Sequence, residues 1–232
     1  MLEKTYRDKI ADNIARINRN IAELSKSCDV GDVRVMAVTK TRSVEEIAVC
    51  VENGITLLGE NRPQEFRDKL DYFETTGCEL HLIGHLQRNK VKYVVGKAHV
   101  IESVDSEEIL EEISSRAEKL GIVQDCLIEV NVGGEENKTG LPTEKLDSLL
   151  EKAALCSGVR IMGLMTVAPN STEAEVERVF EQTRNMFVDI GSKKLHNNIC
   201  MKILSMGMSG DYLLALKHGS NIVRLGREIF RN

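Results

Sequence analysis

Eight short, β-favouring runs separated by longer amphipathic segments constrain this chain more than any other feature. The runs are apolar on both faces, and the segments between them are long enough for crossover helices, which is typical of a parallel sheet covered by helices. Eight such units with no clear edge strand favour closure into a (β/α)₈ barrel, the TIM-barrel fold, over an open sheet. The runs are residues 33–38, 55–59, 80–84, 99–103, 126–132, 160–165, 202–206 and 222–226.

Helix signals occur where this arrangement requires them. Apolar residues recur every three or four positions between about 3 and 26, which predicts an extra helix before the first strand. Ser43, Ser106 and Thr172 are each followed within three residues by glutamate, a pattern typical of helix N-termini, and 173–190 continues at helical spacing. No linker rich in proline, glycine or serine divides the 232 residues. We therefore expect a single barrel domain over residues 1–232.

Composition excludes several function classes. The chain has 31 Lys plus Arg against 36 Asp plus Glu, so nothing favours general nucleic-acid binding. No apolar run approaches the roughly 18 residues of a membrane helix and the N-terminus lacks a secretory pattern, so we expect a soluble, cytoplasmic protein.

Its six cysteines form no CxxC pair and are expected to be reduced. His81 and His85 flank a strand end without a Cys or Glu cluster, so no metal site is predicted.

A barrel carries its functional residues at the C-terminal ends of its strands. Lys40 ends the first run, where a lysine is either a solvated charge or, if the apolar strand desolvates it, a neutral nucleophilic amine. Polar residues also follow most of the other runs, so they are predicted to converge on one rim. They are Glu60, Asn61, His85, Gln87, Asn89, Asn131, Thr166, SMGMS (205–209) and RLGRE (224–228).

The last two of these segments lie where barrels often bind phosphate. Ser209 precedes a helix expected to begin near Asp211, and its hydroxyl, with the amides of Gly226 and Arg227, would suit a phosphate dianion. The alternative is a turn in which Ser209 is only an N-cap. Both interpretations remain open from the spacing alone.

Arg224 alternates with apolar neighbours, so it faces either the barrel interior or the helix layer. It is either part of an ion pair across the barrel mouth or a donor to the ring nitrogen of a bound heterocycle. A lysine, a phosphate cradle and a partner for a ring nitrogen together describe a pyridoxal 5′-phosphate (PLP) site.

Seven motifs in order resemble the pyridoxal phosphate homeostasis protein family over nearly the whole chain: AVTKTRS, LLGENRPQE, HLIGHLQRNK, IEVNVGGEENKTG, GLMTVAP, LSMGMSGDY and IVRLGREIF. The resemblance implies a monomeric barrel similar to the N-terminal domain of alanine racemase, with PLP held as a Schiff base on Lys40. It also implies that Arg224 faces the pyridine nitrogen and that phosphate binds the SMGMS loop and the amides after the last strand. The further cofactor-binding residues so implied are Asn61, Ser205, Met208, Ser209, Gly226 and Arg227.

Two departures from the family stand out. Many relatives carry a small residue at the position of Arg227, so a hydroxyl contact to phosphate is lost there. The sequence also ends at IFRN, earlier than in relatives that add a few residues.

Functions of different classes compete for such a site. A carrier would hold PLP, buffer its aldehyde and deliver it to apoenzymes with little or no turnover. A racemase needs an acid and a base on opposite faces of its substrate, and Lys40 supplies only one. The second, β-rich domain that provides the opposing tyrosine in alanine racemases is expected to be absent, and Arg224 would weaken the ring as an electron sink. These points favour the carrier.

Two further interpretations stay open. A Schiff-base aldolase would leave Arg224 and the SMGMS loop without a role. Lys138, after the fifth strand, is either a solvated loop lysine or a second, transient acceptor of the aldehyde.

Overall fold

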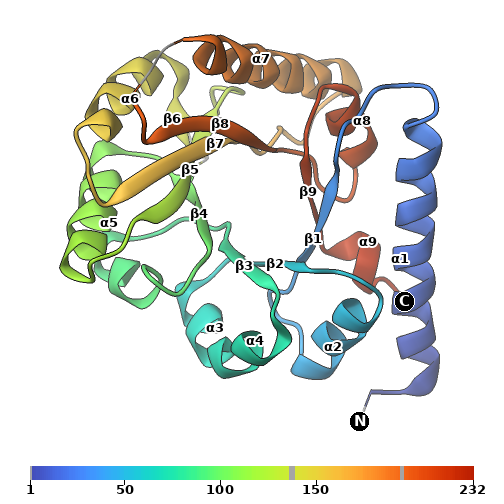
Figure 1. Cartoon of the computed structure of the whole chain (residues 1–232). Helices are drawn as coiled ribbons and strands as arrows, with labels where there is room; N and C mark the ends of the chain where they lie inside the picture. The colour runs from blue at the N-terminus through green and yellow to red at the C-terminus, as the bar shows by residue number, and fades with distance from the viewer. Residues whose placement is uncertain (1, 136–138, 194–195) are drawn as a thin grey trace.

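The computed structural model describes residues 2–135, 139–193 and 196–232, and its centre is a closed barrel (Figure 1). Eight parallel strands follow the order β4-β3-β2-β1-β9-β8-β7-β5, and pairing of β4 with β5 closes the ring. The predicted (β/α)₈ fold is confirmed. The barrel strands are β1 (Arg34–Val38), β2 (Leu57–Glu60), β3 (Glu79–Leu82), β4 (Val100–Val104), β5 (Gln124–Asn131), β7 (Val159–Met165), β8 (Ile199–Ser205) and β9 (Ile222–Leu225).

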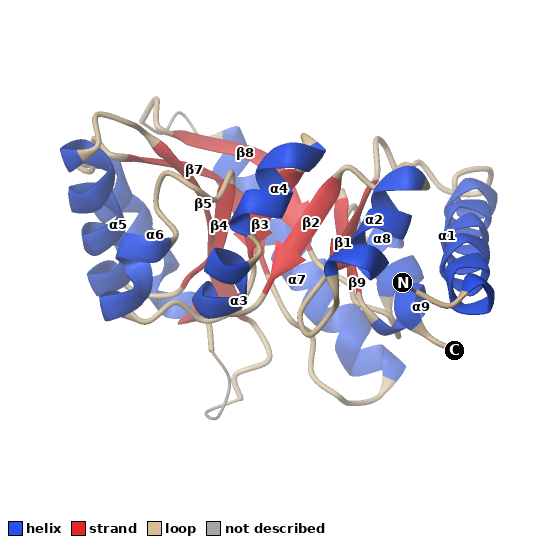
Figure 2. Ribbon diagram, turned by 90° about the horizontal axis from the view of Figure 1, so that it is seen from below, coloured by secondary structure: helices blue, strands red, loops and turns tan. Residues whose placement is uncertain are grey.

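Helices surround the barrel on its outside (Figure 2). Ser43 and Thr172 form complete capping boxes with Glu46 and Glu175, and the Ser106 hydroxyl accepts a hydrogen bond from the amide of Ile109, so all three predicted starts are confirmed. The helices are α1 (Lys4–Leu24), α2 (Val44–Glu52), α3 (Pro63–Asp68), α4 (Leu70–Thr76), η1 (Arg88–Tyr93), α5 (Glu107–Lys119), η2 (Thr143–Lys145), α6 (Leu146–Ala154), α7 (Glu173–Ser192), α8 (Tyr212–Lys217) and α9 (Arg227–Phe230).

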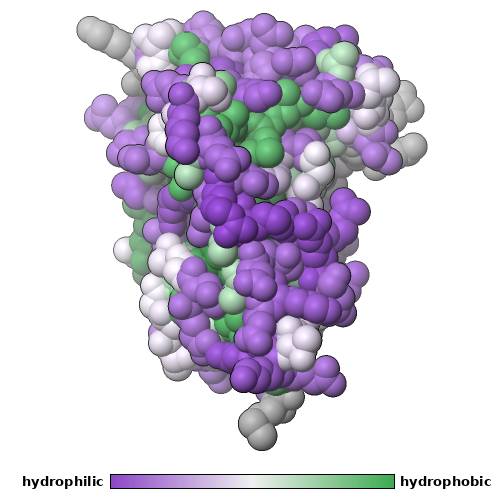
Figure 3. Space-filling model, turned by 90° about the vertical axis from the view of Figure 1, so that its right-hand side faces the viewer, coloured by the Kyte–Doolittle hydropathy of each residue, from purple (hydrophilic) through white to green (hydrophobic). Residues whose placement is uncertain are grey.

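The predicted N-terminal helix is α1, which lies beside α9 in Figure 1. Its buried stripe of Ile10, Ile14 and Ile17 faces the rest of the protein, and Asn13 Nδ2 donates to the carbonyl of Ile229 at 3.0 Å. The side of the molecule that carries α1 is largely hydrophilic in Figure 3. Within the described ranges, no helix is both long and apolar enough to span a bilayer.

Successive strand residues face alternately into the barrel and toward the helices. Two apolar clusters fill part of the interior, and the main hydrophobic core lies between strands and helices. One interior cluster contains Ile222, so Arg224, two residues further along β9, lies on the interior side, whereas Lys40 comes two residues after the end of β1. β9 therefore directs the Arg224 side chain toward the axis of the barrel, where a site at the mouth requires it.

The structure differs from the sequence analysis in two details. A two-residue strand, β6 (Leu141–Pro142), pairs with the end of β5, and it is too short to produce a periodic pattern. The third strand ends at Leu82, two residues before the end of the predicted run, because the chain bends at Gly84. Lys138 lies outside the described residues, so its predicted roles stay untested.

Candidate functional site

Lys40 lies two residues after the last residue of β1, and it is exposed. Of the two alternatives that the sequence left open, this exposure in the chain alone agrees with a solvated side chain and not with one covered by the apolar strand. Hydrogen bonds fix the backbone of the residues on either side of Lys40. Thr41 has a left-handed conformation with φ of 60°, a strained choice for a β-branched residue.

Two charged side chains hold that backbone from outside the barrel. Lys69 Nζ donates to the carbonyl of Thr39 at 2.8 Å and to Glu60 Oε1 at 2.7 Å, while Glu65 Oε2 accepts from the amide of Thr41 at 2.7 Å. Burial raises the pKa of Glu60, against the opposing hydrogen bonds from Lys69 and Thr39. We call Glu60, Glu65 and Lys69 the outer brace; it fixes the turn that carries Lys40 without touching its amine.

Asn61 follows β2 and neighbours Lys40, which follows β1. Val38 of β1 pairs with Gly59 of β2, and Lys40 and Asn61 each come two residues after this pair. Its Oδ1 is buried and has no hydrogen-bond partner among the described residues. The backbone of Asn61 lies so close to Gly84 that a Cβ there would come within 2.1 Å of the Asn61 carbonyl oxygen. Gly84 therefore lets Asn61 reach the mouth, where its free oxygen is available to a ligand.

The loop after β8 meets the end of β9 as predicted. Ser209 Oγ accepts from the amide of Glu228 at 3.1 Å, so it lies at the start of α9. Among the described residues, no acceptor takes the amides of Gly226 and Arg227. Unpaired amides beside a hydroxyl can bind an anion. The amide of Met208, by contrast, already donates to Asp211 Oδ1 at 2.5 Å.

Gly207 makes this loop possible. Its φ is +93°, and a Cβ would meet the Cβ of Ala215 at 2.5 Å. Only glycine combines that backbone conformation with so close an approach to α8. The loop is thus packed tightly enough to present Ser209 at a fixed position.

Arg224 faces the barrel interior and is 4% exposed. Its Nη1 donates to Ser205 Oγ and its Nη2 to the carbonyl of Thr166, each at 2.7 Å. Ser205 therefore belongs to the interior group around Arg224, whereas Ser209 lies with Gly226 and Arg227. The sequence treated the two serines as one phosphate-binding pair, and the structure separates their side-chain contacts.

Sequence reasoning missed three buried interior side chains: His81, Glu102 and Glu129. Glu102 Oε1 lies 2.6 Å from His81 Nδ1, and its Oε2 accepts from Ser205 Oγ at 2.6 Å. Glu129 accepts from Thr139 at 2.8 Å. A charged residue in the middle of an apolar strand run, as in VIESV, was the available signal.

His81 and His85 belong to different environments despite their HxxxH spacing. His81 is inside the barrel, whereas His85 is exposed on the rim, with Nδ1 3.0 Å from Asp105 Oδ2. Over the described residues, no three potential metal ligands of the His, Cys, Asp or Glu type gather.

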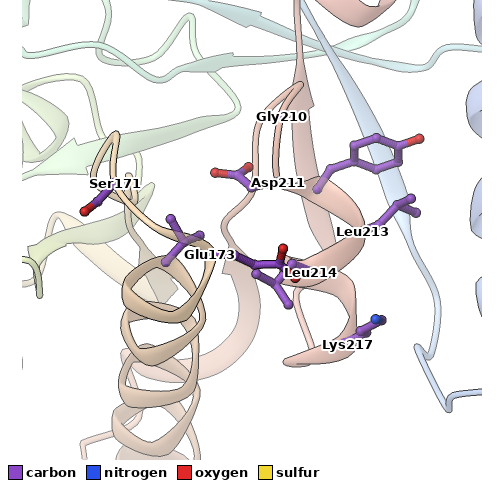
Figure 4. Close-up of a pocket in the computed structure, with 9 residues that line it drawn as sticks. Ser171, Glu173, Gly210, Asp211, Leu213, Leu214 and Lys217 are labelled. Atoms are coloured by element: carbon purple, nitrogen blue, oxygen red, sulfur yellow. The ribbon is translucent and has the colours of Figure 1, made fainter.

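A cavity of about 410 Å³ lies beside the mouth, between the loop before α7 and the start of α8 (Figure 4). Ser171, Glu173 and Asp211 line it, and in Figure 4 the Asp211 carboxylate points toward the loop that carries Ser171. Burial raises the pKa of Asp211, although its bond from the Met208 amide opposes this. None of the predicted cofactor residues lines the cavity, so it neighbours the candidate site and does not form it.

Comparisons with known proteins agree with this fold. Residues 13–230 match the family model described as alanine racemase, N-terminal domain. The pyridoxal phosphate homeostasis protein of Aquifex aeolicus is 38% identical over 221 residues, which cover 93% of this chain and 96% of that protein.

Two solved structures are also similar over nearly their full lengths. An unknown protein from Bifidobacterium adolescentis has a TM-score of 0.94 at 34% identity, with 99% of this chain and 98% of that chain covered. PipY of Synechococcus elongatus PCC7942, solved with PLP bound, has a TM-score of 0.82 at 28% identity, with 95% and 99% covered.

Proposed function

Because the chain belongs to the pyridoxal phosphate homeostasis protein family, we propose that it binds PLP at the barrel mouth, with Lys40 as the point of covalent attachment. The observation that carries this proposal is the meeting of three kinds of group on one rim. An exposed amine at Lys40, a buried guanidinium at Arg224 and the unpaired amides of Gly226 and Arg227 come from the first and last strands, which pair with each other. A PLP-bound relative supports the choice of ligand.

The residues present fit this cofactor part by part. The amides of Gly226 and Arg227, with the Ser209 hydroxyl, suit a phosphate dianion. Asn61 Oδ1 is a buried acceptor without a partner among the described residues, and it needs a donor from a ligand or a water molecule. Ser205 and Met208 stay predicted contacts, with the hydroxyl of Ser205 serving through Arg224.

When bound, the cofactor supplies an aldehyde that can condense with a lysine amine. The chain's own residues then have separable tasks. Lys40 provides the amine on a turn held by the outer brace. Arg224 offers only donors, so it can hydrogen-bond a ring nitrogen that keeps its lone pair.

We further propose that the protein is a carrier with little or no turnover. A racemase needs a second acid or base opposite Lys40, and tyrosine is the residue expected for it. The hydroxyl of Tyr212 accepts from Asn20 on α1 at 2.9 Å, and that of Tyr6 donates to Glu46 at 3.0 Å, both in the outer helix layer. Neither hydroxyl is available at the mouth, which favours holding the cofactor over transforming an amino acid.

The decisive experiment is reduction of the loaded protein with borohydride, followed by peptide mass spectrometry. We expect the cofactor mass on the peptide that contains Lys40, and none there in a Lys40→Ala variant. A visible absorption band of full size in Lys40→Ala, with label on no single residue, would contradict the attachment site.

Carrier and enzyme are separated by turnover. Loaded protein incubated with single amino acids is expected to produce no multi-turnover formation of the opposite enantiomer. Mixed with a PLP-dependent apoenzyme, it is expected to restore activity faster than spontaneous release of the cofactor allows. A Lys138→Ala variant tests the second acceptor, since slower transfer with unchanged affinity is expected if Lys138 passes the aldehyde on.

A further inference from the structure

A line of buried polar side chains crosses the barrel interior and ends on Arg224. His81 Nδ1 lies 2.6 Å from Glu102 Oε1, Glu102 Oε2 accepts from Ser205 Oγ at 2.6 Å, and Ser205 Oγ accepts from Arg224 Nη1 at 2.7 Å. The four residues come from β3, β4, β8 and β9, and none is more than 4% exposed. We call these four residues the interior chain.

The interior chain places polar side chains in the barrel interior, where other positions are filled by apolar side chains. Interior residues such as Met36, Leu57 and Leu127 form apolar clusters. Buried charges cost several kcal/mol each in lost solvation, and apolar residues of similar volume are often neutral or stabilising replacements. Fold stability alone therefore gives no reason for the interior chain, whereas its end on Arg224 lies at the candidate site.

The charges along the interior chain alternate. Burial alone would raise the pKa of Glu102, but the hydrogen bond and charge of His81 outweigh it, and Arg224 adds to the net lowering. Burial lowers the pKa of His81, yet the neighbouring carboxylates of Glu102 and Glu79 make the net direction upward. Both net shifts favour the charged form, and the Glu102 carboxylate lies between the His81 imidazole and the Arg224 guanidinium. Glu79 lies 3.6 Å from His81 Nε2 and pairs with Arg34 at 2.9 Å.

The Ser205 hydroxyl transmits the charge of Glu102 to Arg224. A hydroxyl has one proton to donate. Because Glu102 is an anion that only accepts, Ser205 must donate to it, which turns a lone pair of Ser205 toward Arg224 Nη1. A neutral group at position 102 would remove this bias and leave the hydroxyl free to rotate its proton toward the guanidinium. The Arg224 guanidinium then loses one of its two anchors, the other being the bond from its Nη2 to the carbonyl of Thr166.

We propose that Glu102, oriented by His81, is a positioning residue that fixes the Arg224 guanidinium, through Ser205, for contact with the ring nitrogen of the bound cofactor. This inference rests on the proposed function at the same site. His81 and Glu102 lie below the mouth and reach the ligand only through Ser205 and Arg224. Their removal is expected to weaken recognition of the ring nitrogen and to leave recognition of the phosphate intact.

The test is a double-mutant cycle on PLP affinity with Glu102→Gln, Arg224→Met and the double variant. Glu102→Gln is expected to weaken PLP binding about tenfold, the size of one charge-assisted hydrogen bond. In the Arg224→Met background the same substitution is expected to have no further effect. Additive losses would overturn the proposal, because they would mean that Glu102 acts independently of Arg224.

A ligand analogue separates positioning from a general structural effect. In 1-deaza-PLP the ring nitrogen is replaced by CH, so it keeps the aldehyde and the phosphate but has nothing for Arg224 to contact. We expect Glu102→Gln to weaken PLP binding and to leave deaza-PLP binding unchanged. Equal losses for both ligands would overturn the proposal.

Two further variants guard against misfolding and against a simple charge effect. Ser205→Ala introduces no charge and removes the transmitting hydroxyl, so it is expected to reproduce the selective loss for PLP. Glu129→Gln removes a buried carboxylate whose charge also acts on Arg224 but which bonds to Thr139, and it is expected to leave the PLP to deaza-PLP preference unchanged. Failure of the unmodified protein to bind PLP would instead contradict the proposed function itself.

Discussion

The two sides of the barrel mouth hold their key residues in opposite ways. On the β1 and β2 side, Lys40 is exposed and the outer brace fixes only its backbone. On the β8 and β9 side, Arg224 is buried and its guanidinium is tied at both ends by the interior chain and Thr166. A nucleophilic amine must move to reach and release an aldehyde, whereas a recognition group works best when it is already in place. The architecture thus separates a mobile group from a fixed one.

The largest expected effect of this difference is on the free energy of unfolding of the ligand-free protein. Arg224→Met removes one partner of a buried charge network and is expected to lower the free energy of unfolding by about 3 kcal/mol. Lys40→Met, at an exposed site, is expected to change it by less than about 0.5 kcal/mol. Urea unfolding of the two variants measures both. Similar values for the pair would remove the distinction between the two sides.

The outer brace gives the next largest effect. Lys69→Met leaves the buried Glu60 carboxylate without its cation and is expected to cost about 2 kcal/mol of stability. It should also weaken PLP relative to pyridoxine 5′-phosphate, which lacks the aldehyde and so does not depend on Lys40. Lys69→Arg, which keeps the charge, is the matched control for the unfolding measurement. An unchanged ratio of the two affinities would show that the outer brace does not serve Lys40.

A smaller effect is expected on the way in which the free energy of unfolding depends on pH. The pKa of His81 is raised in the folded protein, so its contribution to stability is complete below its unfolded value of about 6.5 and is lost as pH rises through the folded value. The pKa of Glu102 is lowered, so its contribution is complete above about 4.3 and is lost as pH falls. Unfolding measured across pH in His81→Gln should lack the alkaline decline. A decline identical to that of the unmodified protein would assign it to other groups.

The smallest effect concerns the strained turn after Lys40. Asparagine adopts the left-handed conformation more readily than threonine, so Thr41→Asn is expected to raise the free energy of unfolding by about 1 kcal/mol. Thermal unfolding with a known enthalpy measures the change. A destabilised variant would mean that the contacts of the Thr41 side chain stabilise the protein by more than the strain of its backbone destabilises it.

Local sequence patterns predicted the barrel well because its strands and helix starts depend on neighbouring residues. The alternation of runs predicted all eight barrel strands, and Ser43 and Thr172 predicted helix starts from residues three positions apart. The contacts of the outer brace with Thr39 and Thr41, and the contacts within the interior chain, were missed because they join different segments of the chain. Glu102 and Ser205 are 103 residues apart, and no spacing rule connects them. The exposure of Lys40 was left open by the sequence, because the residues that could cover a side chain after the end of a strand come from elsewhere in the chain.

The pairing of β1 with β9 also has a consequence for biogenesis. Arg34 lies in register with Ile222, so the two sides of the mouth are joined by strands from opposite ends of the barrel sequence. During synthesis the turn with Lys40 leaves the ribosome early, whereas Arg224 and the amides after it emerge last. A nascent chain therefore exposes a lysine without the groups that would select a ligand for it, and the selective site exists only once the ring has closed.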